Sequence, residues 1–335
     1  MSGGITQLIA IGAQDTHIVG NPEVSFFRST YRRHTNFSQV VDRQTIQGNP
    51  SDGGISTIRI ERKGDMLGYT YFTFKNGSSE TIPVPGNLFS NVELLFGGQL
   101  VDEQDDTFVR LIGSQLLVGS SGKVNNSREN FYPLHFFFCE NWQSALPLIA
   151  LQYHDVELRI TWNTVPAGNQ VECFCNFVYL DTAERDQMAG QEFDMLVTQT
   201  QKVKKSGTYV QEMTFNHPVK FLASNTALVS SPSSSTLKLQ LNGSDVSNPR
   251  THDPHFSNAM IYHHCPYTVQ AGSIGFLYPF CLDTNKTQPS GTLNFSRIDT
   301  ARFVSNEKFD QADIYAVNYN ILHIQNGMGG LKYAN

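Results

Sequence analysis

The sequence predicts an all-β protein built from two consecutive β-sandwich domains. Apolar and polar residues alternate with a period of two along several segments, as they do in half-buried strands. Two glycine-containing turns join such segments into hairpins, one in each half of the chain. Long amphipathic helices with capping residues do not occur, and only short helices are expected, at residues 105–117 and 182–195. With 335 residues and 39% hydrophobic content, the chain can bury one or two cores.

The clearest strand pattern lies at residues 156–162. Its apolar side chains share one face, and they are Val156, Leu158, Ile160 and Trp162. A second pattern, at residues 92–96, ends in Gly97-Gly98 and resumes at residues 99–101. Because glycine adopts a positive φ without steric cost, two glycines between strand segments predict a tight hairpin.

The second half of the chain repeats this design. Leucines alternate with polar residues over 237–241, and Asn242-Gly243 then supplies the sequence preferred for a two-residue hairpin turn. The two turns are 145 residues apart, counted from Gly98 to Gly243. That spacing accommodates one eight-stranded sandwich with its loops, so the length fits two β-domains.

We place the domain boundary in a polar stretch near the middle of the chain. The stretch TQTQKVKKSG, residues 198–207, is basic and poor in core residues. This gives an N-terminal domain at residues 1–200 and a C-terminal domain at residues 201–335. The first strand of the second domain is then expected at residues 209–215.

Composition and charge exclude several classes of partner. Charged residues form 16% of the chain and the net charge is −6, while lysine and arginine are scattered except at Arg32-Arg33 and at residues 202–205. Nucleic-acid binding requires a basic footprint, so no direct nucleic-acid contact is expected. No apolar stretch approaches the ~18 residues of a membrane span, and the N-terminus lacks the basic region of a signal peptide. We therefore expect synthesis and folding in the cytosol.

Two pairs of polar residues could carry chemistry, but each has a simpler explanation. Asp155 and Glu157 alternate on the polar face of a strand, where solvated charges are expected. Cys173 and Cys175 lie on the apolar face of another strand. Their apolar neighbours there indicate that both are small core residues and not metal ligands. All cysteines are expected to be free thiols, because their odd number, five, shows no paired spacing.

The richest cluster of possible metal ligands lies in one polar segment, at His252, His255, His263, His264 and Cys265. Its spacing matches no compact zinc motif, so surface histidines or a pH-sensitive subunit contact are favoured. Gly327, Gly329 and Gly330 are reminiscent of a phosphate loop but lack a following helix and a Lys-Ser/Thr pair. No nucleophile elbow, zincin pair or P-loop occurs, so we expect no catalytic residues, no cofactor and no metal, and hence no enzyme.

Six Asn-x-Ser/Thr triplets are candidate glycosylation sites, at Asn36, Asn76, Asn125, Asn242, Asn285 and Asn294. Asn76, Asn242 and Asn285 are the candidates that we retain. Asn76 and Asn242 both lie in Asn-Gly-Ser sequences and are expected to be turn residues first.

Blocks of sequence along nearly the whole chain resemble the major capsid proteins of nucleocytoplasmic large DNA viruses, especially those of algal viruses. In the first half these blocks are GAQD (12–15), NPEVSFFRSTYRRHTNF (21–37), VELLFGGQLVD (92–102), YPLHFFFCENWQSALPLIALQYHDVEL (132–158) and YLDTAER (179–185). In the second half they are FNHPVKFLAS (215–224), LQLNGSD (239–245), QPSGTLNFSRIDTA (288–301) and NYNILHIQNGMGGLKYAN (318–335). Several blocks in one order make a chance match implausible.

The resemblance implies a double jelly roll that forms homotrimers. Six similar β-sandwiches would then make a pseudo-hexagonal capsomer of an icosahedral shell. It also implies a virion protein that is made and assembled in the host cytoplasm and lies near an inner membrane in the virion. Its partners would be itself, neighbouring capsomers and minor capsid proteins. Relatives carry longer outward loops than residues 225–236 and 250–272 of this chain, so a compact paralogue or a minor capsid protein is an open alternative.

Contacts in such a shell are expected from loops and chain ends, because jelly rolls hide most strand edges. The N-terminal arm, with Phe26, Phe27 and Tyr31 among arginines, is the expected inner-face element, and the alternative is a twisted first strand. Residues 327–335 are expected to be ordered, because three apolar side chains can anchor them. A rival function is a jelly-roll glycan-binding attachment module, against which the lack of a Trp-rich loop or an acidic calcium cluster argues.

Overall fold

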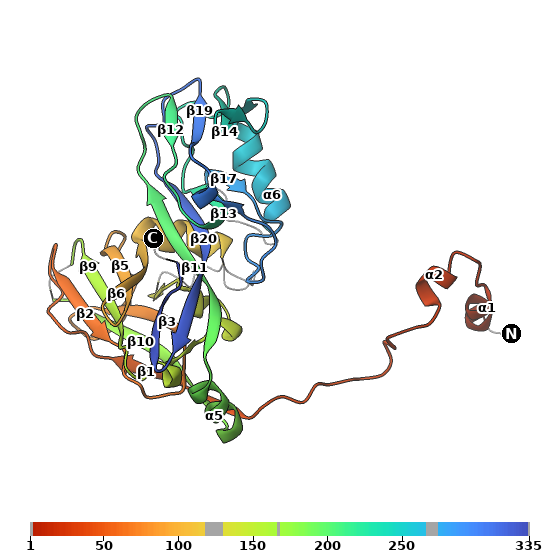
Figure 1. The fold of residues 1–335 in the computed structure, drawn as a ribbon, viewed down its shortest axis with the longest axis horizontal. Coiled ribbons are helices and arrows are strands. Elements are labelled where there is room, and N and C mark those ends of the chain that lie inside the picture. Colours follow the sequence, from red (N-terminus) through yellow and green to blue (C-terminus); the bar gives the residue numbers. More distant parts are fainter. Residues whose placement is uncertain (1–2, 118–129, 166–167, 266–273, 334–335) are drawn as a thin grey trace. The chain divides into compact units, whose positions relative to one another are not determined.

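The computed structural model describes residues 3–117, 130–165, 168–265 and 274–333. The chain divides into two compact units, an arm, Met1–Asn36, and a body, Phe37–Asn335. The arm contains helices α1 (Gly3–Ile9) and α2 (Thr16–Val19), which are followed by extended chain without strand pairing (Figure 1). The first strand begins at Phe37, so the alternative that residues 26–33 are a twisted first strand is wrong.

The first half of the body is a sandwich of two antiparallel sheets. Sheet A has the order β1 (Phe37–Gln44), β10 (Gln170–Leu180), β3 (Met66–Lys75), β4 (Thr81–Ile82), and β7 (Tyr132–Pro133) and β8 (Leu146–Pro147) also pair with β3. Sheet B has the order β2 (Ile55–Arg59), β9 (Val156–Trp162), β5 (Phe89–Phe96), β6 (Gln99–Asp105). Their facing side chains form one core, in which Phe72 of β3 meets Phe89 of β5 at 5.0 Å between ring centroids.

The second half contains a second sandwich of the same kind. Sheet C has the order β11 (Phe193–Val203), β20 (Ile314–Gln325), β13 (Pro218–Ser224), β17 (Phe276–Pro279), with β18 (Leu293–Asn294) pairing β13 and β21 (Met328–Leu331) pairing β20. Sheet D has the order β12 (Val210–Glu212), β19 (Ala301–Ser305), β14 (Thr236–Leu241), β15 (Ser244–Asp245), with β16 (Arg250–Thr251) pairing β14. A separate core lies between these two sheets.

The strand order is the same in both sandwiches. In the first, β1 pairs with β10 and β2 with β9; in the second, β11 pairs with β20 and β12 with β19, so the chain winds through both sheets in the same way. This interleaving of two antiparallel sheets is the jelly-roll arrangement. The predicted double jelly roll is confirmed.

Both predicted hairpins are present at corresponding places in this order. The turn between β5 and β6 has φ of +54° at Gly97 and +84° at Gly98, and the turn between β14 and β15 has φ of +49° at Asn242 and +81° at Gly243. Two successive positive φ values match the right-handed twist of the flanking strands. Glycine or asparagine at these positions is therefore what the backbone requires.

The period-two pattern of β9 also predicts its facing correctly. All four of its apolar side chains are buried in the core between sheets A and B, whereas Arg159 is exposed and Glu157 is half-buried. Leu158 lies between Ile58 of β2 and Leu94 of β5 in the paired register.

Helices are short, as expected. The two predicted helical stretches contain η1 (Phe108–Gly113) with α3 (Ser114–Leu116), and α5 (Thr182–Gly190). The remaining short helical segments are α4 (Phe137–Glu140), η4 (Trp142–Ser144), η5 (Leu148–Ala150), η6 (His252–Ala259), α6 (Met260–His264) and η7 (Phe295–Arg297). No helix within the described ranges is long and apolar enough to cross a membrane.

The expected linker at residues 198–207 is wrong over its first half, because β11 continues to Val203 and pairs with β20 along its whole length. The second sandwich therefore begins at Phe193, and the strand expected near residue 209, which is β12, is its second. Polar residues occur in β11 because only parts of its two faces are buried. The division into residues 1–200 and 201–335 stays a prediction, and the place of β11 in sheet C favours a boundary before Phe193.

Candidate functional site

Five aromatic side chains form a continuous surface on the outer side of sheet A, and we call this surface the aromatic face: Tyr69, Tyr71, Phe131, Trp142 and Phe174. Tyr71 lies at its centre, 5.5 Å from Phe174 and 5.9 Å from Phe131 between ring centroids. Tyr69 links Tyr71, at 6.2 Å, to Trp142, at 5.9 Å. Trp142 is 58% and Tyr69 37% exposed. A contiguous exposed aromatic surface is typical of a protein interface.

The charged residues beside the aromatic face are joined by ion pairs. Glu172 of β10 is buried, and its carboxylate pairs with Arg43 of β1 at 3.1 Å and with Lys75 of β3 at 2.7 Å. These three residues lie on neighbouring strands of sheet A, where Glu172 pairs in register with Thr73. The outer side of the sheet can therefore receive an apolar partner without leaving a buried unpaired charge.

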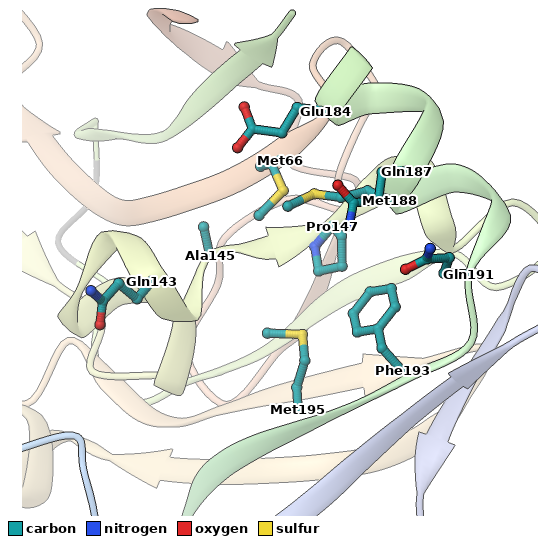
Figure 2. Close-up of a pocket in the computed structure, with 10 residues that line it drawn as sticks. All are labelled: Met66, Gln143, Ala145, Pro147, Glu184, Gln187, Met188, Gln191, Phe193 and Met195. Carbon is teal, nitrogen blue, oxygen red and sulfur yellow. The ribbon is translucent and has the colours of Figure 1, made fainter. Parts of the chain in front are cut away.

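A cavity of about 340 Å³ lies beneath α5, where α5 meets β8 and β11 (Figure 2). Its lining is rich in methionine, with Met66, Met188 and Met195. Flexible thioether side chains adapt to apolar groups of different shapes. The Oε2 atom of Glu184 at the same cavity is buried and makes no hydrogen bond to any described residue. The cavity thus combines apolar side chains with the polar groups of Glu184 and of Gln143, Gln187 and Gln191.

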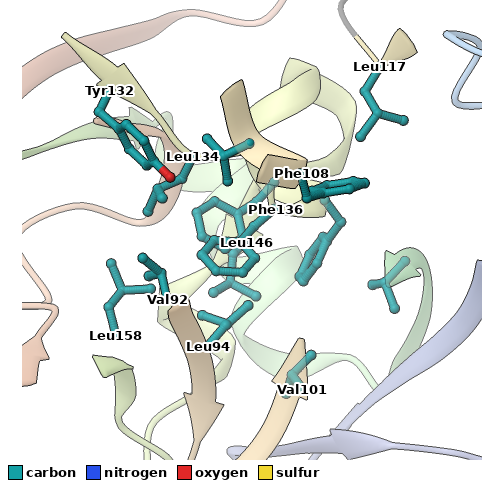
Figure 3. Close-up of a cluster of buried hydrophobic side chains, with 14 of the residues drawn as sticks. Val92, Leu94, Val101, Phe108, Leu117, Tyr132, Leu134, Phe136, Leu146 and Leu158 are labelled. Atoms are coloured by element: carbon teal, nitrogen blue, oxygen red, sulfur yellow. The ribbon is translucent and has the colours of Figure 1, made fainter. Parts of the chain in front are cut away.

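The two jelly rolls share an apolar junction. Sheet C contacts a hydrophobic core on each side, because its outer face joins the core of the first jelly roll through Val197, Phe221, Ala223, Leu277, Tyr315, Val317, Leu322 and Ile324. Figure 3 shows part of the first core, including Val101 of β6 and Phe108 of η1. Phe108 packs against Tyr315 of β20 at 5.9 Å between ring centroids. The segment that follows the β5–β6 hairpin therefore covers the outer side of sheet C.

Polar contacts between β6 and β11 border this junction, along a groove of about 650 Å³. The carboxylate of Asp105 accepts hydrogen bonds from the Tyr315 hydroxyl at 2.7 Å and from Lys202 Nζ at 2.8 Å. Asp102 accepts a hydrogen bond from the Thr200 backbone N–H at 2.8 Å. Burial raises the pKa of Asp102 to about 7, although its three N–H donors favour the ionised form. The contact that joins the two jelly rolls therefore contains a carboxyl that titrates near neutrality.

The arm carries exposed apolar side chains. Every described residue from 3 to 36 is exposed within the arm, and Phe27 is 99% exposed. Phe26, Tyr31 and Ile18 are also exposed, so the arm has no core of its own. These apolar side chains are therefore available to a binding partner.

The three retained asparagines lie in different environments. Both polar atoms of the Asn76 side-chain amide form hydrogen bonds. Its Nδ2 donates to Glu80 Oε2 at 3.1 Å, and its Oδ1 accepts from the Ser78 backbone N–H. Asn242 is exposed, and its Oδ1 accepts from two backbone N–H groups at 3.0 Å, which ties the hairpin turn to residues 299–300. Asn285 is half-buried, and its Oδ1 has no hydrogen-bond partner among the described residues. Asn125 lies outside the described residues.

The carboxylates and cysteines weighed as catalytic or metal-binding groups have structural partners. Asp155 pairs with Arg59 at 2.5 Å and with Arg62 at 3.3 Å. Cys173 and Cys175 are buried in the first core as expected. A hydrogen bond with Cys175, together with burial, raises the pKa of the Cys173 thiol well above its ordinary value. A thiol that stays protonated is a poor metal ligand.

The structure does not bring the histidine cluster together. His252 is not a surface residue, contrary to expectation, because its ring packs on Phe276 in the second core and its Nε2 accepts from the Leu228 backbone at 3.2 Å. Burial lowers the pKa of His252 to about 4. His264 lies elsewhere, where its Nδ1 atom is 3.0 Å from the carbonyl oxygen of Cys281. Within the described ranges, no three His, Cys, Asp or Glu side chains are grouped so that they could hold a metal.

Residues 327–333 of the C-terminal segment pack against the body, as predicted, and residues 334–335 lie outside the described residues. β21 pairs with β20, and the segment also contacts the first jelly roll, where the Tyr153 N–H donates to the Gly327 carbonyl at 2.9 Å. His154 Nδ1 lies 2.8 Å from the Gly329 carbonyl oxygen. A Cβ on Gly329 would lie 2.5 Å from Leu151 Cδ2, so a larger residue would have to displace this buried side chain. These glycines serve strand packing and not a phosphate loop.

Two family descriptions match the chain in tandem. "Major capsid protein N-terminus" matches residues 25–181, and "Large eukaryotic DNA virus major capsid protein" matches residues 224–330. The first match spans the first jelly roll, and the second match spans most of the second one, from the end of β13 onward.

Individual relatives align along the full chain. The major capsid protein of Pyramimonas orientalis virus is 33% identical, and that of Paramecium bursaria Chlorella virus 1 is 31% identical, each over 100% of both chains. Among solved structures, the PBCV-1 protein VP54, fitted into a cryo-EM reconstruction of the virophage Sputnik, has a TM-score of 0.78 at 28% identity. That match covers 93% of this chain and 100% of the other.

Proposed function

The chain belongs to the major capsid proteins of large eukaryotic DNA viruses, and we propose that it builds the capsid of such a virus as a homotrimeric capsomer. The observation that carries this proposal is the repeated jelly roll, aligned over its whole length with proteins named major capsid protein. A trimer of two-sandwich chains presents six similar sandwiches in a ring. Such a block has the pseudo-hexagonal outline that tiles an icosahedral face.

The proposed role is structural and does not involve catalysis. Its partners are other copies of the chain, neighbouring capsomers and minor capsid proteins, close to an inner membrane of the virion. Assembly would take place in the host cytoplasm. Burial of self-complementary apolar surface would drive trimer formation, since obligate interfaces commonly exceed ~2,000 Å² and have apolar centres.

Sedimentation of the purified full-length chain tests this function. A capsomer should sediment as a stable trimer at micromolar concentration, and electron microscopy should show particles with a hexagonal outline. A monomer that binds glycans on an array would support the rival attachment module and contradict the capsomer. Incorporation only at rare positions of a native shell would favour a minor capsid protein over the principal one.

We also propose that Asn76, Asn242 and Asn285 are glycan attachment sites, with Asn242 the best placed. A glycan is attached to the Nδ2 atom, and the backbone contacts of Asn242 use only its Oδ1. Asn242→Asp keeps an acceptor for the turn but removes Nδ2. The variant should lose one glycan mass from its tryptic peptide while its melting temperature stays the same. An unmodified Asn242 peptide in the native virion protein would rule this site out.

A further inference from the structure

We propose that the aromatic face of sheet A is the docking surface for the η6–α6 segment, residues 252–264, of a second copy of this chain. The inference rests on the proposed capsomer and names the surfaces that would hold it together. It follows from the internal repeat, because the chain already shows this contact once between its own two jelly rolls.

The contact within the chain involves the outer side of sheet C. That side is covered by the end of β6 and the helical segment that follows it. The Tyr315 hydroxyl of β20 donates a hydrogen bond to Asp105 Oδ2 at 2.7 Å, and the Tyr315 ring packs on Phe108 at 5.9 Å between ring centroids. Gln199 of β11 adds a hydrogen bond to the Val101 carbonyl of β6. One jelly roll thus offers a sheet face, and the other offers the helical segment after its hairpin.

The repeat gives each of these elements a counterpart. Sheet A has the same strand order as sheet C, and η6 with α6 follows the β14–β15 hairpin as η1 with α3 follows the β5–β6 hairpin. The counterparts do not meet within one chain, because α6 and sheet A lie at different ends of the body (Figure 1). The aromatic face and η6–α6 therefore each lack the partner that their counterparts have.

The two surfaces match in chemistry. Tyr262 of α6 is 82% exposed, and its ring lies edge-on to His263 at 5.1 Å between ring centroids. Asp253, the acidic residue of the segment, is bound internally by Ser257 Oγ at 2.5 Å and Asn258 Nδ2 at 2.8 Å. On the opposite side, the buried carboxylate of Glu172 is itself paired with Arg43 and Lys75. Exposed aromatic side chains without uncompensated carboxylates are the residues that dominate protein interfaces.

The contact joins two different patches, so it is heterologous. When a single such contact joins two copies, one copy keeps a free sheet face and the other keeps a free helical segment. Heterologous contacts therefore generate rings or open filaments. A ring of chains, each carrying one internal and one external contact of the same type, is a closed capsomer.

Two single variants test the proposal, Tyr69→Asp on the aromatic face and Tyr262→Asp on α6. Tyr209→Asp is the matched control, since Tyr209 is an exposed tyrosine outside both surfaces, at 54%. Each interface variant should raise the dissociation constant of the trimer at least about 30-fold, the change expected of one interface hot spot, while the control keeps the trimer. All three should keep the melting profile of the folded monomer, because the side chains are exposed.

Mixing the variants provides the sharper result. Tyr262→Asp retains an intact aromatic face and Tyr69→Asp retains an intact α6, so equimolar mixing should restore one contact and give a heterodimer without a trimer. Trimers that survive both single variants would refute this contact but not the capsomer, whereas a monomeric unmutated chain would refute both. Loss of the trimer with Tyr69→Asp alone would assign the aromatic face to another occupant, such as the arm, and overturn the proposal.

Discussion

Replacing Leu158 by aspartate should unfold the first jelly roll, whereas replacing the adjacent Glu157 by lysine should change its stability little. Leu158 is 0% exposed and lies between Ile58 and Leu94 on the neighbouring strands. Figure 3 shows its side chain beside Val92 in the core. Glu157, one position away on β9, points to the other side of sheet B and is half-buried.

The two substitutions differ greatly in expected free energy. Removing the buried leucine side chain costs about 2–5 kcal/mol. A carboxyl without a hydrogen-bond partner in that position adds roughly 2–7 kcal/mol, even if it binds a proton. The total is comparable with the ~5–15 kcal/mol by which a domain is stable. Glu157→Lys only replaces a favourable pairing with Arg59, its neighbour in register, by a repulsive one, which costs about 1 kcal/mol or less.

Urea and thermal unfolding of the purified variants measure this difference. Leu158→Asp should fail to give a cooperative transition, while Leu158→Ala, which makes a cavity without a charge, should still fold with a lower midpoint. Glu157→Lys should melt within a few degrees of the unmutated chain. Similar midpoints for Leu158→Asp and Glu157→Lys would refute the facing assigned to β9.

Three further perturbations test other parts of the structure. Deleting residues 327–335 should lower both the melting temperature and the yield of trimer, because β21 pairs with β20 and contacts the first jelly roll; an unchanged trimer of unchanged stability would show that the segment is dispensable. Deleting residues 1–36, a separate compact unit, should leave the melting temperature of the body unchanged in calorimetry, and a large decrease would contradict its independence. The folded chain keeps a proton on Asp102, whose pKa is raised to about 7, while the unfolded chain releases it above about pH 4. This contribution should therefore make stability fall as the pH rises from about 4 to 7, and Asp102→Asn should remove that slope; identical slopes in urea titrations of variant and parent would exclude the effect.

The elements that the sequence predicted best are those whose pattern is local. The facing of β9 and the two hairpin turns follow from neighbouring residues, because strand periodicity and positive φ are local constraints. The linker prediction failed at β11 for the opposite reason. Its polar residues find partners far away in the sequence, such as Gln199 with the Val101 carbonyl, so polarity alone did not indicate exposure.

The candidate site was less predictable than the fold. The aromatic face combines residues of β3 and β10 with Phe131 and Trp142, which are distant in sequence from Phe174 and become neighbours only through sheet A. The histidines show the converse. Their closeness in sequence indicated a cluster, yet His252 turns into the second core while His264 faces a different loop.

The sequence by itself determined the fold class, the hairpins and the family, since each depends on residue pattern along the chain. Only the tertiary structure decided that sheet C contacts a hydrophobic core on each side while the aromatic face of sheet A stays exposed. Both sheets contain apolar and aromatic residues on their outer sides, so composition could not distinguish them. The difference arises because the segment after the β5–β6 hairpin packs on sheet C, and that contact joins residues such as Asp105 and Tyr315, which are 210 positions apart. Burial of this kind is set by which surfaces meet after folding, and no local pattern encodes it.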